Sequence, residues 1–98
     1  MNQLNALDFT SGVVVPEQVL VRQLDDEIVI LDLASESYFG LDEVGTAMWN
    51  EVTAAESIEH AFQSLLEQYD VEPETLRTDM QALLQQLIEK KLLEIRAA

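Results

Sequence analysis

Apolar residues between Val13 and Leu41 follow a strand-like rhythm, and most of them are β-branched or aromatic. This pattern predicts three short strands, at about residues 19–24, 28–33 and 38–41. The acidic segment 25–27 is short and polar enough to form a hairpin loop, and residues 34–36 form the next turn. Pro16 lacks an amide hydrogen and is therefore expected before the sheet.

After Leu41 the apolar spacing changes to that of helices. Asp42 is an expected N-cap for a short helix that places Val44, Ala47, Met48 and Val52 on one face. A second helix is expected to begin near Ser57, and its apolar positions are Ile58, Ala61, Phe62, Leu65, Leu66 and Tyr69. A third and longer helix starts at Pro73, because proline suits the first helical position. Its core side is expected to carry Leu76, Met80, Leu83, Leu84, Leu87 and Ile88, and Lys90 and Lys91 favour its C-terminal end.

The order of these elements predicts an α+β fold, in which a three-stranded antiparallel sheet is followed by three helices. A sheet this small must bury one face on the helices to be stable. No repeat, low-complexity tract or linker interrupts the chain, so we expect a single domain over residues 1–98, with residues 1–15 as a candidate flexible segment.

The third strand is the most informative predicted element. In a meander the second strand is central, which leaves the third with an unpaired edge. Residues 37–41 carry no charge to blunt that edge, so it is open to strand addition by a peptide, with main-chain hydrogen bonds giving affinity and side-chain pockets giving specificity. The prediction requires that residues 13–15 do not pair with this edge in the same molecule.

The balance of charge restricts the partners. The 98 residues include 19 acidic and 5 basic side chains, for a formal net charge of −14. Such a field repels phosphate backbones and anionic lipid surfaces and favours a basic or neutral peptide, or a basic groove on a larger protein. No nucleic acid and no membrane partner is expected, and nothing resembles a signal peptide or a membrane span, so we expect a soluble cytoplasmic protein.

The sequence offers only weak candidates for catalytic or metal-binding residues. The chain has no cysteine, which excludes disulfides and thiolate chemistry. His60 lies near Glu56 and Glu59, but one histidine without further ligands is typical of a solvated helix face. Ser57 is expected to cap a helix, so it is a poor nucleophile candidate. A short chain also has little room to bury an active-site cavity. We therefore expect a non-catalytic binding protein without cofactor or metal.

Residues 36–49, from Glu36 to Trp49, resemble the strand-to-helix signature of the PqqD-like family. In order of elements the resemblance spans residues 19–95, and only the central run is specific in sequence. The resemblance implies a winged-helix-like recognition element of the kind that serves enzymes modifying ribosomally made peptides, as in the pyrroloquinoline quinone and lasso-peptide pathways. Such a domain acts as a peptide chaperone: it binds a leader peptide as an added strand and presents it to a modifying enzyme or leader peptidase.

The same resemblance implies the binding residues. The edge would consist of Ser37, Tyr38, Phe39, Gly40 and Leu41, and the facing wall of the last helix would be drawn from Leu76, Asp79, Met80, Leu83 and Leu84. Tyr38 and Phe39 point to opposite sheet faces, and the sequence does not decide which of them faces the groove. Replacing Phe39 or Leu41 by Asp is expected to abolish peptide capture with the fold retained.

Ordinary packing is the alternative for several of these residues. Trp49 and Met80 are each more typical of a core position than of a ligand anchor. The surplus of leucines on the last helix fits simple packing, a groove or a homodimer contact.

Two other functions compete with peptide recognition. A small acidic carrier or a protein-protein adaptor would suit the charge, but a carrier needs its attachment serine at a helix start, whereas Ser64 lies within a predicted helix. A winged-helix DNA-binding protein would need a basic surface, which the composition denies.

Overall fold

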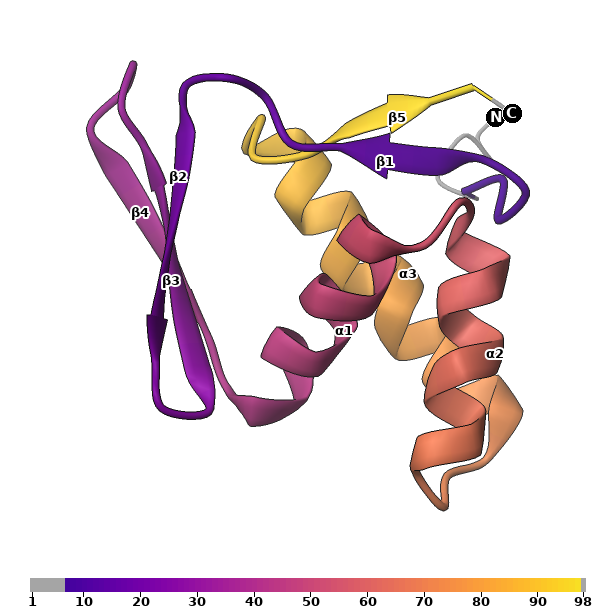
Figure 1. Ribbon diagram of the computed structural model, residues 1–98. Coiled ribbons are helices and arrows are strands. Elements are labelled where there is room, and N and C mark those ends of the chain that lie inside the picture. The colour runs from indigo at the N-terminus through magenta and orange to yellow at the C-terminus, as the bar shows by residue number, and fades with distance from the viewer. Residues whose placement is uncertain (1–6, 98) are drawn as a thin grey trace.

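The structure is a computed structural model that describes residues 7–97. Its strands are β1 (Gly12–Val14), β2 (Val19–Leu24), β3 (Glu27–Asp32), β4 (Ser37–Leu41) and β5 (Glu94–Arg96). Its helices are α1 (Glu43–Ala54), α2 (Ile58–Gln68) and α3 (Pro73–Glu89). The helices lie together on one side of the β2-β3-β4 sheet, and none of the described residues covers the other face of that sheet (Figure 1).

The predicted meander and the α+β class are confirmed. The sheet has the order β2-β3-β4, and both pairings are antiparallel. Leu24 pairs with Glu27, so the hairpin loop consists of Asp25 and Asp26, and Asp25 adopts a φ of 56° that aspartate tolerates better than most residues. The first hairpin therefore turns within two residues, whereas residues 33–36 connect β3 to β4.

Both predicted side-chain caps are present. The carboxylate of Asp42 accepts a hydrogen bond from the Gly45 N–H at 2.9 Å, and the Ser57 hydroxyl accepts one from the His60 N–H at 3.1 Å. Each cap satisfies a backbone donor that the first turn of a helix leaves free. Pro73 is the first residue of α3, as predicted.

The core lies between the inner face of the sheet and the three helices. Ile28 and Ile30 of β3 are 1% and 0% exposed, and they share one cluster with Trp49, which is 3% exposed and so is a core residue. The remaining core members on the helices include Met48, Val52, Ile58, Ala61, Phe62, Leu65, Leu76, Met80, Leu84 and Leu87.

A predicted core position on α1 is wrong. Val44 was expected on the packed face of α1, but it is 60% exposed. The buried stripe of α1 begins one residue later and follows Gly45, Met48, Trp49 and Val52 at helical spacing. Val44 lies instead in the lining of two surface pockets.

The sequence did not predict β1 and β5. They form a separate antiparallel pair in which Gly12 lies opposite Arg96. Residues 7–15, part of the candidate flexible segment, pack on the fold, and Phe9 is buried against Phe62. Residues 1–6 lie outside the described residues. Within residues 7–97 no helix is long and apolar enough to cross a membrane.

Candidate functional site

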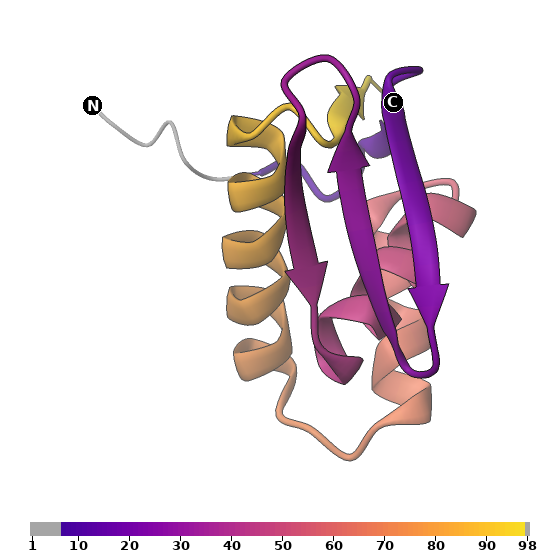
Figure 2. The same cartoon turned by 90° about the vertical axis from the view of Figure 1, so that its left-hand side faces the viewer.

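Strand β4 has one unpaired edge. It pairs with β3 on one side, and no strand among residues 7–97 pairs with its other side. The N-terminal segment that would have covered this edge pairs with β5. Figure 2 shows the uncovered edge of β4 facing helix α3. A row of backbone donors and acceptors is thus left open beside a helix.

Alternation along β4 decides which side chains enter the space between strand and helix. Phe39 and Leu41 face inward: Phe39 is partly buried, and Leu41 is 6% exposed. Tyr38 faces outward and is 71% exposed. The question that the sequence left open between Tyr38 and Phe39 is therefore answered in favour of Phe39.

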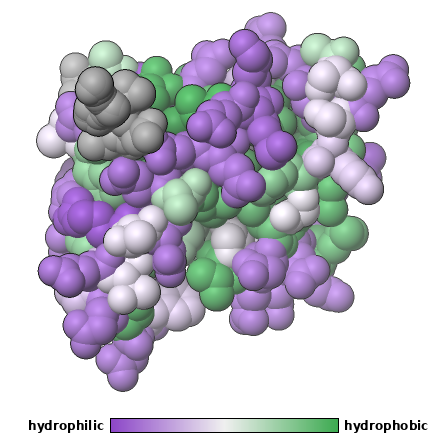
Figure 3. Space-filling model, turned by 180° about the vertical axis from the view of Figure 1, so that it is seen from behind, coloured by the Kyte–Doolittle hydropathy of each residue, from purple (hydrophilic) through white to green (hydrophobic). Residues whose placement is uncertain are grey.

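An open groove of 490 Å³ runs between β4 and α3 and reaches the start of α1. Seen from behind, hydrophobic side chains gather in this region of the surface between hydrophilic ones (Figure 3). The ammonium nitrogen of Lys90 lies 5.8 Å from the centre of the Phe39 ring. The lining consists of Phe39, Gly40, Leu41, Asp42, Val44, Gly45, Met48, Asp79, Ala82, Leu83 and Gln86.

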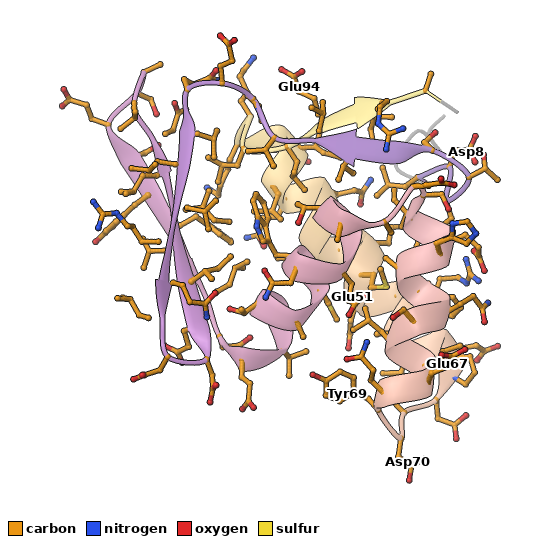
Figure 4. All side chains as sticks on the ribbon, in the orientation of Figure 1. Asp8, Glu51, Glu67, Tyr69, Asp70 and Glu94 are labelled. Atoms are coloured by element: carbon orange, nitrogen blue, oxygen red, sulfur yellow. The ribbon has the colours of Figure 1, made fainter. Side chains whose placement is uncertain are left out.

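A second pocket of 290 Å³ continues the groove. The two hollows share Val44, Met48 and Asp79, so they form one surface that passes the start of α1. Tyr69 projects from the end of α2 toward α1, whereas Asp70 lies at the following turn (Figure 4). The pocket is lined by Val44, Ala47, Met48, Leu65, Tyr69, Asp70, Val71, Leu76 and Asp79, most of which are apolar.

The five α3 residues predicted for the site lie in three different places. Asp79 and Leu83 line the groove, and Leu76 lines the second pocket. Met80 and Leu84 are 0% and 1% exposed and lie in the core beneath the groove. The binding role of all five residues stays a prediction.

Six residues that line the groove were not predicted from the sequence: Asp42, Val44, Gly45 and Met48 near the start of α1, and Ala82 and Gln86 on α3. A signal exists for the two on α3, because Asp79, Ala82, Leu83 and Gln86 follow helical spacing i, i+3, i+4, i+7. This stripe runs beside the core stripe of Leu76, Met80, Leu84 and Leu87.

Perturbed carboxylates lie outside the groove. Hydrogen bonds from the Thr10 side chain and backbone lower the pKa of Asp8. The pKa of Glu59 is lowered mainly by a hydrogen bond from Gln63, and also by Arg77. Within residues 7–97 no group of three or more His, Cys, Asp or Glu side chains is arranged to hold a metal ion. The groove therefore offers backbone groups and apolar walls, which suit binding of an extended chain.

Comparison with known proteins agrees with this geometry. The family described as Coenzyme PQQ synthesis protein D (PqqD) matches residues 27–93. A solved structure of TbiB1 in complex with the TbiA(beta) leader peptide is 32% identical and has a TM-score of 0.76, covering 82% of this chain and 93% of that chain. A solved structure of lasso peptide synthetase B1 complexed with the leader peptide is 24% identical with a TM-score of 0.76, covering 85% of this chain and 98% of that chain, and it supports the fold alone. No curated protein sequence matches the chain.

Proposed function

The chain belongs to the PqqD family, and from this premise we propose that it binds the leader segment of a ribosomally synthesised precursor peptide by strand addition. It presents that peptide to a separate modifying enzyme or leader peptidase, and it is itself non-catalytic and needs no cofactor. It acts in the cytoplasm, where ribosomes release such precursors. The shared core of the described residues supports a single recognition domain.

The free edge of β4 is the observation that carries the proposal. A peptide laid along Ser37–Leu41 would gain main-chain hydrogen bonds that depend little on its sequence. Its alternate side chains would enter the groove between Phe39 and Leu83. The TbiB1 structure, 32% identical to this chain, is a complex with a leader peptide, which supports the same role here.

The second pocket adds a specificity element. It is more enclosed than the groove and is lined by apolar side chains such as Leu65 and Leu76. A peptide that leaves the end of β4 would reach this pocket with a residue outside the paired segment. We expect that residue to be a large apolar one, because burial of such a side chain contributes roughly 1.5–3 kcal/mol.

The negative charge of the chain affects the rate at which it associates with a peptide. A formal charge of −14 attracts a basic precursor and speeds its association. The peptide loses conformational entropy when it becomes ordered on the protein, which lowers its affinity. We therefore expect dissociation constants from roughly micromolar to roughly tens of nanomolar.

The site is tested by isothermal titration calorimetry, which measures the affinity of the chain for the leader peptide of a precursor encoded next to its gene. Leu83→Asp and Phe39→Ala remove an apolar wall on either side of the groove and are expected to weaken binding by about tenfold or more. Leu33→Asp is the matched control, because Leu33 is 62% exposed and does not line the groove. Its affinity should equal that of the unmodified chain.

Leu41 is not suitable for this test. It is 6% exposed and belongs to the core cluster, so an aspartate there would destabilise the fold, contrary to the sequence-based expectation. Unchanged affinity in both groove variants, with circular dichroism showing a retained fold, would refute the proposed site.

A further inference from the structure

The outer face of the β2-β3-β4 sheet is apolar, and no element within residues 7–97 covers it. The helices pack on the opposite face, so every second residue of the three strands points to solvent (Figures 1 and 2). Leu20 and Leu24 of β2 are 42% and 60% exposed, and Tyr38 of β4 is 71% exposed. We define the outer face by its apolar members, Leu20, Leu24, Val29, Leu31, Tyr38 and Gly40.

The strand register joins these residues into one surface. Leu20 lies opposite Leu31, and Leu31 lies opposite Tyr38, so an apolar row crosses all three strands. In an antiparallel sheet such partners are in side-chain contact distance. Contiguous exposed apolar surface of this kind marks an interaction site more often than scattered single residues do.

Gly40 on the same face is not required by the fold. No glycine among the described residues has a positive φ, and a Cβ on Gly40 would meet nothing within 4 Å. A glycine within a strand costs roughly 0.5–1 kcal/mol relative to alanine. Glycine at such a position often marks the close approach of another chain.

We propose that the outer face docks the enzyme that acts on the bound peptide, an inference that rests on the proposed function. The enzyme's docking surface is expected to be apolar at its centre and basic at its margin. Asp25, Asp26 and Glu27 lie at one end of the face and Glu36 at the other, against one cation, Arg22, within it. Opposite charge at the margin then adds specificity and speeds association.

Position favours this occupant. A peptide added to β4 becomes the fourth strand of the sheet, and its alternate side chains join the same face as Tyr38. An enzyme docked there lies directly beside the peptide it must process. A second copy of the chain is a poorer occupant, because each copy brings a formal charge of −14 and the same acidic margin.

The size of the face fits a transient contact. Three strands of five or six residues span about 17–20 Å by about 10–15 Å, or roughly 200–300 Å² of docking surface. Stable complexes bury about 800 Å² on each partner. The face therefore suits an enzyme that binds, processes the peptide and leaves.

The test uses the double variant Leu20→Glu/Leu24→Glu, which changes β2, the strand farthest from the peptide edge. The matched control is Val14→Glu/Ile95→Glu on the β1–β5 sheet, where the two side chains are 45% and 42% exposed. Biolayer interferometry measures the affinity of each variant for the purified peptide-processing enzyme encoded next to its gene. Calorimetry measures the affinity of each variant for the leader peptide. The outer-face variant should bind the enzyme about tenfold or more weakly, with peptide affinity unchanged and the control unchanged in both.

Four results would overturn the docking proposal. They are enzyme affinity retained in the outer-face variant, an equal loss in the control, a parallel loss of peptide affinity, and a wild-type dimer in sedimentation that the outer-face variant dissociates. A wild-type chain that binds the enzyme but no leader peptide would refute the proposed function instead, so the two failures are distinguishable.

Discussion

Thr46 ties helix α1 to the sheet through one buried hydroxyl. Its Oγ1 accepts a hydrogen bond from the Ile28 N–H at 3.1 Å and donates one to the Leu41 carbonyl at 3.3 Å. Ile28 and Leu41 are opposite each other at the end of the β3–β4 ladder. A single side chain therefore fixes the end of the candidate binding strand to the helix that follows it.

Replacing Thr46 by Val keeps the shape and removes both hydrogen bonds. The buried Ile28 N–H and Leu41 carbonyl lose their hydroxyl partner, so we expect unfolding free energy to fall by about 1–3 kcal/mol. Urea denaturation followed by circular dichroism measures the change. Thr53→Val is the control, because Thr53 bonds only to carbonyls of its own helix. Equal losses in the two variants would contradict the bridging role.

The elements that sequence predicts best are those with local causes. Strand β2 matches its predicted bounds, and the two helix caps at Asp42 and Ser57 depend on donors three residues away. Strands β1 and β5 were missed because each has three residues and its partner lies about 80 positions away in the chain. Neither segment carries enough pattern of its own to indicate a strand.

The candidate site was predictable in part for the same reason. The free edge at Ser37–Leu41 follows from strand order, which a meander fixes locally. The α3 side of the groove does not follow from local sequence. The rotation of α3 against the core determines which stripe of its residues borders the groove. Met80 and Leu84 satisfy the apolar spacing equally well, yet the fold turns them inward and leaves Asp79 and Leu83 beside the groove.

Gly12 is required where the β1–β5 pair crosses the end of α1. A Cβ there would lie 2.7 Å from the Glu56 carbonyl oxygen and would also collide with the Arg96 guanidinium. Gly12→Ala is therefore expected to destabilise the fold by about 1–3 kcal/mol, since backbone must move. Gly40→Ala meets nothing and should be neutral or stabilise by up to about 1 kcal/mol. Thermal melts compare the two, and a Gly12→Ala variant as stable as wild type would refute the clash.

The main sheet has two edges that no strand within residues 7–97 pairs with, those of β2 and β4. Only β4 borders the groove, so the leader peptide should protect alternate backbone amides of Ser37–Leu41 from hydrogen exchange. The amides along the outer edge of Val19–Leu24 should exchange as fast with the peptide as without it. Exchange followed by NMR separates the strands, and protection of β2 instead of β4 would place the peptide on the wrong edge for this proposal.

At the scale of the whole molecule, self-repulsion opposes folding. The formal charge is −14, and within residues 7–97 a single ion pair joins Arg77 to Glu59 at 3.3 Å, with both side chains well exposed. An exposed pair of this kind contributes little stability. Repulsion among carboxylates therefore outweighs attraction in the electrostatic balance of the folded chain.

Added salt should consequently raise the melting temperature. Between about 0.01 M and about 0.15 M ionic strength the Debye length falls from about 30 Å to about 8 Å. The molecule measures 37 × 35 × 22 Å, so in dilute buffer repulsion reaches across it and in the higher salt only near neighbours interact. Calorimetric melts in sodium chloride should rise steadily over this range, and choline chloride should give the same rise because screening depends on ionic strength alone. A melting temperature that falls with salt would mean that attractive ion pairs dominate the electrostatics of the folded chain. The expected preference for basic partners would then lose its basis, because it depends on a net repulsive acidic surface.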